Sequence, residues 1–332
     1  MSSAQAINSV VKRWQLDARY VPLVITISLF VAMATAGSVF YDGFFAPQVF
    51  LNLLIDNAFL CIVAVGMTFV ILTGGIDLSV GSIIALTTMI SASLVQQYHV
   101  SPFITMPLVL VVGSLFGLLH GFLIQRFRLQ PFIVTLAGMF LARGLSYLIS
   151  TESISIDNSV YTFIAQTRIP LGSASLSISA VIAIVVVLAG MWMAHATQFG
   201  RTVYAVGGDE ASARLMGLPV DKTLIGVYLL SGFCSALAGV VMTFYMLSGY
   251  SLHAVGLELD AIAAVVIGGT LLRGGIGYVA GTFFGVLILG IIQTLIVFDG
   301  TLSSWWTRIM VGVLLLIFCL LQRFLEARRK GH

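Results

Sequence analysis

The chain has 332 residues, of which 59% are hydrophobic and only 9% are charged, and its formal net charge is +3. Soluble globular domains carry about 25% charged residues, so this composition excludes a water-soluble enzyme and a nucleic-acid-binding protein. The mean hydropathy of +1.07 is spread over most of the length, which predicts an all-α polytopic membrane protein without a cleaved leader.

Ten apolar stretches are candidates to cross a hydrocarbon core of about 30 Å, which takes about 20 helical residues. They form a predicted transmembrane domain at 21–322, between a cytoplasmic segment at 1–20 and a basic tail at 323–332. The eighth stretch is short, which leaves open whether it is re-entrant. We expect the spans at 22–40, 53–73, 82–96, 103–124, 132–149, 176–195, 224–247, 261–272, 276–298 and 305–321.

Lysines and arginines fall mainly on one side of this arrangement. Ten spans put both termini on the same side, and 13 of the 16 cationic residues lie there. Positive charge marks the cytoplasmic side, so both termini and the polar stretch at 198–222 are expected to be cytoplasmic. The opposite connections have Arg168 as their one clear cation. Their acids are expected to be Asp42, Glu152, Asp157, Glu258, Asp260 and Asp299.

An internal similarity supports this topology. Residues Met67–Gly74 and Met242–Gly249 share five identities and one Thr/Ser exchange over eight positions, at a shift of 175 residues. A shift of five spans reverses the chain direction, so the halves are expected to form an inverted repeat. Many transporters have this plan, with a substrate site between their halves. Chance similarity between apolar segments is the alternative.

The stretch at 198–222 is the longest strongly polar interruption and holds six charged residues, which exclude it from hydrocarbon. Asp209 is a good N-cap for a short helix, and Gly217 is a good stop signal. Gly200, Gly207 and Gly208 are interpreted as hinges before it. A capped helix outside the bilayer predicts a docking surface for another protein.

Polar side chains inside the apolar stretches are candidates for lining a pathway or gate, because amides and hydroxyls suit an uncharged sugar. The ordinary alternative is that each bonds a neighbouring helix or its own backbone. For Asp77, we favour a cap of the third span near the cytoplasmic interface over a functional ionisable group. The candidates are Asn57, Thr68, Thr73, Asp77, Arg143, Thr243 and Gln293.

Two glycine series with a spacing of four, at 113–121 and 277–285, are interpreted as close helix packing. Trp305 is expected in the aromatic belt at the membrane surface. The sequence has no P-loop and no catalytic or metal motif, so we expect no catalytic residue, metal or cofactor in this chain. Glu258 and Asp260 leave open an intramembrane enzyme acting on lipid-linked sugars, although we interpret both as loop acids.

Four longer runs follow in order: NAFLCIVAVGMTFVILTGGIDLSVGSIIAL (57–86), FIVTLAGMFLARGLSYL (132–148), FGRTVYAVGGDEASARLMG (199–217) and ELDAIAAVVIGGTLLRGGIGYVAGTFFG (258–285). They resemble the permease subunits of bacterial ribose-type ABC sugar importers and, more distantly, branched-chain amino-acid permeases. With DGTLSSWWTRI (299–309), the chain is most similar to a permease of a galactofuranose importer. The resemblance covers nearly the whole chain after the first twenty residues.

The resemblance implies a non-catalytic, multi-pass inner-membrane subunit that pairs with a second permease in a heterodimer. It also implies a cytoplasmic ATPase, which binds ATP and Mg, and a periplasmic sugar-binding protein. Alternatives to galactofuranose are ribose or another sugar, and a secondary carrier without an ATPase is a further alternative. The family's ATPase-contacting loop falls on Gly200, Arg201, Ala205, Gly207, Ala211 and Gly217.

Overall fold

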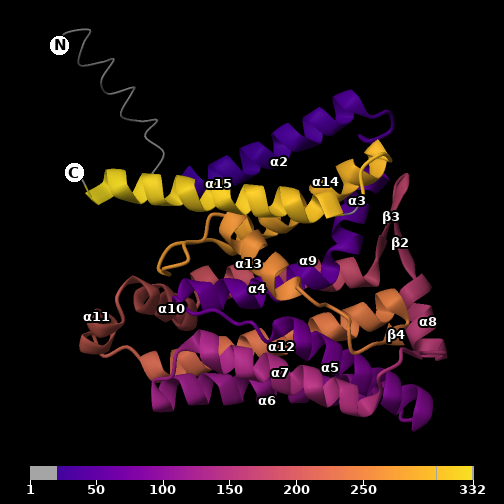
Figure 1. The fold of residues 1–332 in the computed structure, drawn as a ribbon, viewed down its shortest axis with the longest axis horizontal. Coiled ribbons are helices and arrows are strands. Elements are labelled where there is room, and N and C mark those ends of the chain that lie inside the picture. Colours follow the sequence, from indigo (N-terminus) through magenta and orange to yellow (C-terminus); the bar gives the residue numbers. More distant parts are fainter. Residues whose placement is uncertain (1–20, 304, 331–332) are drawn as a thin grey trace.

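The computed structural model describes residues 21–303 and 305–330, with side chains for all of these except Val21 and 322–330. The predictions for the segment at 1–20 and for the side chains of the basic tail lie outside the described residues. Helices run lengthwise between two ends of the molecule (Figure 1). One end carries α10 (Gln198–Gly208) and α11 (Glu210–Leu215), and we call it the α10–α11 end. The other carries short strands, and we call it the hairpin end.

The described part of the chain is mostly helical. The stretch at 150–175, which we expected as a loop, contains a short helix and strands. Beyond α10 and α11, the helices are α2 (Val21–Phe40), α3 (Pro47–Asp56), α4 (Ala58–Leu72), α5 (Val80–Ala92) continued by the π-helix η1 (Ser93–Gln97), α6 (Pro102–Phe127), α7 (Pro131–Ile149), α8 (Ser159–Gln166), α9 (Ile178–Ala196), α12 (Val220–Met246), α13 (Leu257–Ile267), α14 (Val279–Asp299) and α15 (Trp305–Lys330). The antiparallel strand pairs are β1 (Ile154–Ser155) with β4 (Ser248–Gly249), and β2 (Arg168–Leu171) with β3 (Ala174–Ser177).

Local signals explain where several helices begin. Pro47, Pro102 and Pro131 each occupy the first helical position of α3, α6 and α7. Proline fits there because its missing N–H would have no intrahelical partner. At α9, the side chain of Ser177 accepts a hydrogen bond from the Ala180 amide, which satisfies one of the free amides at the helix start.

Among the described residues, fewer than ten helices have the length and composition of a full membrane span. Seven are long and apolar enough to cross a membrane, and α3 with α4, bent by 59°, forms an eighth candidate. α13 has eleven residues, which at about 1.5 Å per residue cannot cross the bilayer alone. The apolar part of α15, Trp305–Leu321, is also shorter than the seven helices that qualify as full spans. Each of the ten predicted stretches contains a helix, but ten full spans are not confirmed.

Two helices begin inside the bundle rather than at its surface. After α4 ends at the α10–α11 end, residues 73–79 turn back, and α5 begins near the middle of α6, where Ile83 lies close to Gly113. After α12 ends at the hairpin end, residues 247–256 also turn back, and the first turn of α13 lies against Gly81 of α5. The two halves therefore follow one plan in opposite directions, as an inverted repeat would.

Glycines allow the central helices to pack closely. A Cβ atom on Gly113, Gly117 or Gly121 of α6 would meet backbone atoms of α12. On α14, Gly281 and Gly285 lie in the same way against the backbone at the end of α13. Such close approach supplies the van der Waals contact that holds helices together where lipid is as apolar as the helix surface. The packing interpretation is confirmed for the series on α6 and for Gly281 and Gly285, whereas Gly277 precedes α14 and lies against the side chain of Thr270.

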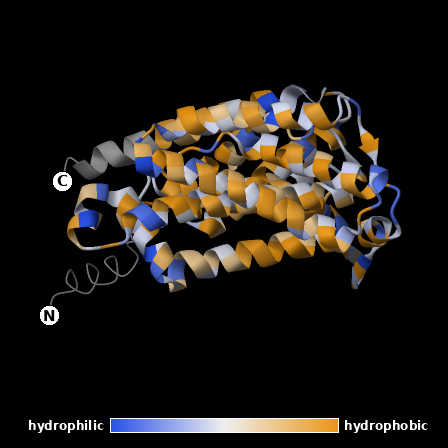
Figure 2. Ribbon diagram, turned by 90° about the horizontal axis from the view of Figure 1, so that it is seen from below, coloured by the Kyte–Doolittle hydropathy of each residue, from blue (hydrophilic) through white to orange (hydrophobic). Residues whose placement is uncertain are grey.

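Apolar residues cover the bundle between its ends, and hydrophilic residues concentrate at the two ends (Figure 2). Leu115 on α6 and Val185 on α9 lie near the middle of their helices and are 56% and 58% exposed. A large exposed apolar surface is unfavourable in water, whereas helices with satisfied backbones and apolar surfaces suit lipid. The fold is therefore that of an all-α, multi-pass membrane protein.

Candidate functional site

The polar stretch at 198–222 forms two capped helices and the start of α12. Thr197 caps α10 by accepting a hydrogen bond from the Gly200 amide at 3.1 Å. Asp209 caps α11 by accepting one from the Ser212 amide at 2.6 Å. Hydrogen bonds from the Ser212 side chain and amide hold the pKa of Asp209 below its ordinary value. Gly217 follows α11 with a φ of 76°, so the predicted capped helix with its glycine stop is confirmed.

The interpretation of Gly200, Gly207 and Gly208 as hinges is wrong, because all three lie within α10. Close packing explains the first two. A Cβ atom on Gly200 would meet the last carbonyls of α9, and one on Gly207 would meet the Leu72 carbonyl and the Gly275 amide. A Cβ atom on Gly208 would have no neighbouring atom within 4 Å. The missing side chains let α10 lie against the ends of α9 and α4.

The end of α11 presents a surface that another protein can contact. Leu215 and Met216 are 89% and 67% exposed. Beside them, Arg214 pairs with Glu210 at 2.9 Å and with Asp221 at 2.6 Å. Hydrogen bonds with Glu210 and Asp221 raise the pKa of Arg214, so the cation is kept. The pairs join α11 to the first turn of α12 and fix the position of the exposed apolar tip.

Two cavities lie beside these helices. One, of about 590 Å³, is bordered by Arg201 and Lys222. The other, of about 620 Å³, is bordered by Thr73 at the end of α4 and by Ala211. Arg201 and Ala211 are exposed, whereas Ala205 packs partly against the apolar cluster that joins α10, α11 and α12. All six residues that the resemblance assigned to docking therefore lie on α10, on α11 or directly after it.

Asp77 is fully buried within the bundle. Its Oδ1 accepts hydrogen bonds from the Ser79 amide at 2.9 Å and the Ser79 hydroxyl at 2.6 Å, and its Oδ2 accepts one from the Ser231 hydroxyl at 2.7 Å. Ser79 occupies the N-cap position of α5, and this helix has no side-chain cap. Our interpretation of Asp77 as a cap near the interface is therefore wrong. The carboxylate instead ties the segment at 73–79 to α12.

Three further candidates bond within the bundle. The Thr68 hydroxyl lies 2.8 Å from that of Thr282 and joins α4 to α14. The Thr243 hydroxyl donates to a carbonyl of its own helix at 2.6 Å. The Arg143 guanidinium donates to two carbonyls in the segment at 247–256 and so holds the turn before α13. The structure does not bring these three side chains together.

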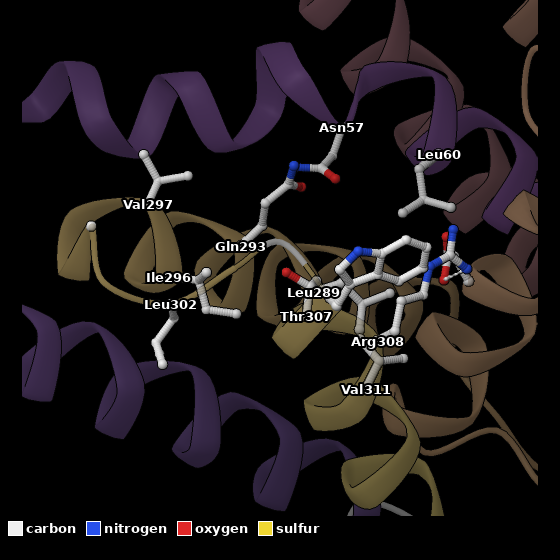
Figure 3. A pocket seen from close by; sticks show the side chains of 13 residues that line it. Asn57, Leu60, Leu289, Gln293, Ile296, Val297, Leu302, Thr307, Arg308 and Val311 are labelled. Carbon is white, nitrogen blue, oxygen red and sulfur yellow. Dashed lines mark ion pairs between the residues drawn. The ribbon is translucent and has the colours of Figure 1, made fainter.

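Asn57 and Gln293 do come together, in a pocket of about 540 Å³ between the α3–α4 bend, α14 and α15 (Figure 3). Their amide groups point toward one another. The Asn57 Nδ2 atom donates to the Leu53 carbonyl at 2.9 Å, which leaves its Oδ1 atom as an acceptor. Gly300 and Leu302, in the turn between α14 and α15, also border the pocket. The pocket therefore lies in the half of the bundle near the hairpin end.

Asp260 of α13 and Arg308 of α15 border the same pocket. Sequence reasoning considered Asp260 only as a loop acid or a catalytic acid, and it missed Arg308. The Arg308 Nη1 and Asp260 Oδ1 atoms are 3.7 Å apart. The interpretation of Glu258 and Asp260 as loop acids is wrong, because α13 begins inside the bundle. Trp305 also lines the pocket. An arginine within an apolar stretch was the available signal, since such residues face the bundle interior more often than lipid.

Comparisons with known proteins agree on one family. The model of the branched-chain amino acid transport system / permease component family matches residues 49–319. The chain is 52% identical over 307 residues to the inner membrane ABC transporter permease protein YjfF of Escherichia coli (strain K12), covering 92% of each protein. It is 40% identical over 334 residues to the fructose import permease protein FruG of Bifidobacterium longum, covering 98% and 97%. It is 37% identical over 309 residues to the ribose import permease protein RbsC of Haemophilus influenzae, covering 91% and 93%. No solved structure matches the chain.

Proposed function

We propose, since the chain belongs to the branched-chain amino acid transport system / permease component family, that it carries a monosaccharide across the inner membrane as the permease subunit of an ATP-binding-cassette importer. The observation that carries this proposal is that relatives named as fructose and ribose import permeases align over more than nine-tenths of the chain. The chain is a transport subunit and not an enzyme. Galactofuranose is the first candidate cargo, because the chain with its run at 299–309 resembles a permease of a galactofuranose importer. Ribose and fructose are the next candidates.

In this proposal, ATP and Mg bind a separate cytoplasmic ATPase, which contacts α10 and α11. The exposed apolar tip at Leu215 and Met216 and the cation at Arg201 supply a contact surface. Gly207 brings α10 against the Leu72 carbonyl, so movement of α10 reaches the segment that turns back into the bundle at 73–79. The ATPase can shift the transporter between inward-open and outward-open states only through contacts that differ between those states.

The same proposal assigns sides and partners to the bundle. The α10–α11 end and both chain termini face the cytoplasm, because this end carries Arg126, Arg128, Arg201 and Lys222 and positive charge favours that side. The hairpin end then faces the periplasm and receives a sugar-binding protein. A second permease packs against part of the exposed apolar surface and completes a heterodimer.

A double substitution on the docking surface tests the proposed function. Arg201→Glu combined with Ala211→Arg changes charge and size on two exposed residues without touching a buried contact. We expect normal membrane levels and a fall in uptake of radiolabelled sugar of about tenfold, the order of a typical coupling free energy between sites. ATP hydrolysis by the co-purified ATPase should no longer respond to sugar and binding protein. Arg126→Glu, a charge reversal at the same end but on α6, is the matched control.

Unchanged uptake in the double variant would exclude α10 and α11 as the docking surface. Uptake that persists without any ATPase partner and collapses with the proton gradient would instead identify a secondary carrier. Turnover of an isoprenoid-linked sugar by the purified chain would identify an enzyme. Each outcome separates one alternative from the importer.

A further inference from the structure

The pocket between the α3–α4 bend, α13, α14 and α15 has room and polar groups for a small molecule. Its volume of about 540 Å³ lies within the roughly 300–1,000 Å³ of small-ligand pockets. We infer that it binds a neutral monosaccharide, recognised by Asn57, Gln293, Trp305 and the pair of Asp260 and Arg308. This inference rests on the proposed function, because it names the place where the permease holds its cargo.

The bend between α3 and α4 places an amide in the pocket. Asn57 lies at this bend, and its Nδ2 atom is also close to where a side chain on Gly290 would begin. The absence of that side chain lets Asn57 approach α14. Gln293 lies three residues further along α14 and is exposed to the pocket. Each amide offers both a donor and an acceptor group, which matches a hydroxyl that can donate and accept.

The charges of the pocket balance one another. Among the described residues that line it, Asp260 and Arg308 are the charged ones. Their separation of 3.7 Å exceeds the 2.7–3.2 Å of a hydrogen bond, so both groups keep capacity for ligand hydroxyls. A neutral ligand can bond both groups while leaving them paired. The extra charges of an amino-acid zwitterion would compete with this pair for its partners.

Trp305 and the turn before it complete the site. Trp305 is 75% exposed, and its indole ring can cover the apolar face of a sugar while its N–H remains a donor. Gly300 and Leu302, in the turn between α14 and α15 at the hairpin end, border the pocket. The α10–α11 end lies at the opposite end of the bundle (Figure 1). A sugar that arrives at the hairpin end would reach this pocket before it crosses the rest of the bundle.

Cysteine protection in the complete importer tests the inference. In a Cys319→Ser background, Cys61 and Cys234 are buried. Thr307→Cys, at a residue that lines the pocket but takes no part in the proposed recognition, then places one reactive thiol in the pocket. We expect a membrane-impermeant maleimide to label it in spheroplasts, and D-galactose, D-fructose or D-ribose to slow the labelling. At ten times the dissociation constant the rate should fall about tenfold, because only the empty fraction reacts. L-Leucine should not protect.

Matched variants separate binding from general effects. Ser173→Cys, exposed on the β2–β3 turn at the hairpin end, should react at the same rate with and without sugar. Adding Trp305→Ala to Thr307→Cys should abolish protection, whereas Trp306→Ala should preserve it, because Trp305 lines the pocket and Trp306 does not. A Thr307→Cys thiol that does not react, or that leucine protects, would overturn the inference.

The two proposals can fail separately. Uptake of a sugar that gives no protection at Thr307→Cys would leave the importer standing and remove the pocket as its sugar site. Protection by a sugar that the complex does not take up would support the pocket and contradict the importer. Absence of both uptake and protection across the three sugars would contradict both.

Discussion

Asp77 is a carboxylate held inside the bundle by donors from two segments. The Ser79 amide and hydroxyl fix one oxygen, and the Ser231 hydroxyl fixes the other. Backbone that is not helical survives at membrane depth only where it is buried in protein and its polar groups are bonded. The three bonds therefore explain how the segment at 73–79 can return into the bundle without regular secondary structure.

Substitutions at Asp77 should separate the role of its hydrogen bonds from that of its charge. Asp77→Ala leaves the Ser79 amide and the Ser231 hydroxyl without this acceptor, whereas the Ser79 hydroxyl still has His120 Nδ1 at 3.4 Å. The substitution should destabilise the protein by roughly 1–3 kcal/mol for each of the two orphaned groups. Asp77→Asn keeps an acceptor for Ser79 and offers a donor to the Ser231 hydroxyl, so it should melt close to the native protein. Thermal unfolding in detergent measures both. Equal melting of the native and Ala variants would show that these bonds carry no stability.

At the scale of elements, the sequence predicted features that depend on neighbouring residues. It did not predict features that depend on contacts between residues far apart in the chain. The cap at Asp209 and the stop at Gly217 gave α11, because capping depends on residues within one helical turn. Local reasoning failed for α10, where it interpreted Gly207 as a hinge. A side chain at Gly207 would collide with backbone atoms of Leu72 and Gly275, and these two residues lie far away in sequence. Likewise, Asn57 and Gln293 were found as polar residues in spans. They line one pocket with Asp260 and Arg308 because α13 begins inside the bundle, and no local sequence pattern specifies where α13 begins.

The contact of α10 with α4 can be tested with two adjacent glycines. A methyl group on Gly207 would meet the Leu72 carbonyl and the Gly275 amide, while one on Gly208 would meet nothing. Gly207→Ala should therefore displace α10, at a cost of about 1–3 kcal/mol for overpacking, and reduce sugar uptake. Gly208→Ala should leave melting temperature and uptake unchanged. Equal behaviour of the two variants would contradict close packing at this point.

At the scale of the whole molecule, the reversed plan of the two halves explains where the candidate sites lie. In one half, the chain turns back at the α10–α11 end and begins α5 within the bundle. In the other half, the chain turns back at the hairpin end and begins α13 within the bundle. Gly81 and the first turn of α13 meet where these helices begin. The docking surface and the pocket thus lie at opposite ends and are joined through two helices that contact each other.

The orientation of the bundle gives the last prediction. Only α9 crosses the bundle between the β2–β3 turn and α10, so Ser173 and Ser212 must lie on opposite sides of the membrane. Because positive charge favours the cytoplasmic side, Arg126, Lys222 and their neighbouring cations support the proposal that the Ser212 side is cytoplasmic. In a Cys319→Ser background, an impermeant maleimide should label Ser173→Cys in intact spheroplasts and Ser212→Cys only after permeabilisation. The reverse pattern would place α10 and α11 in the periplasm, where no ATPase could reach them. Labelling of both from one side would contradict the fold itself.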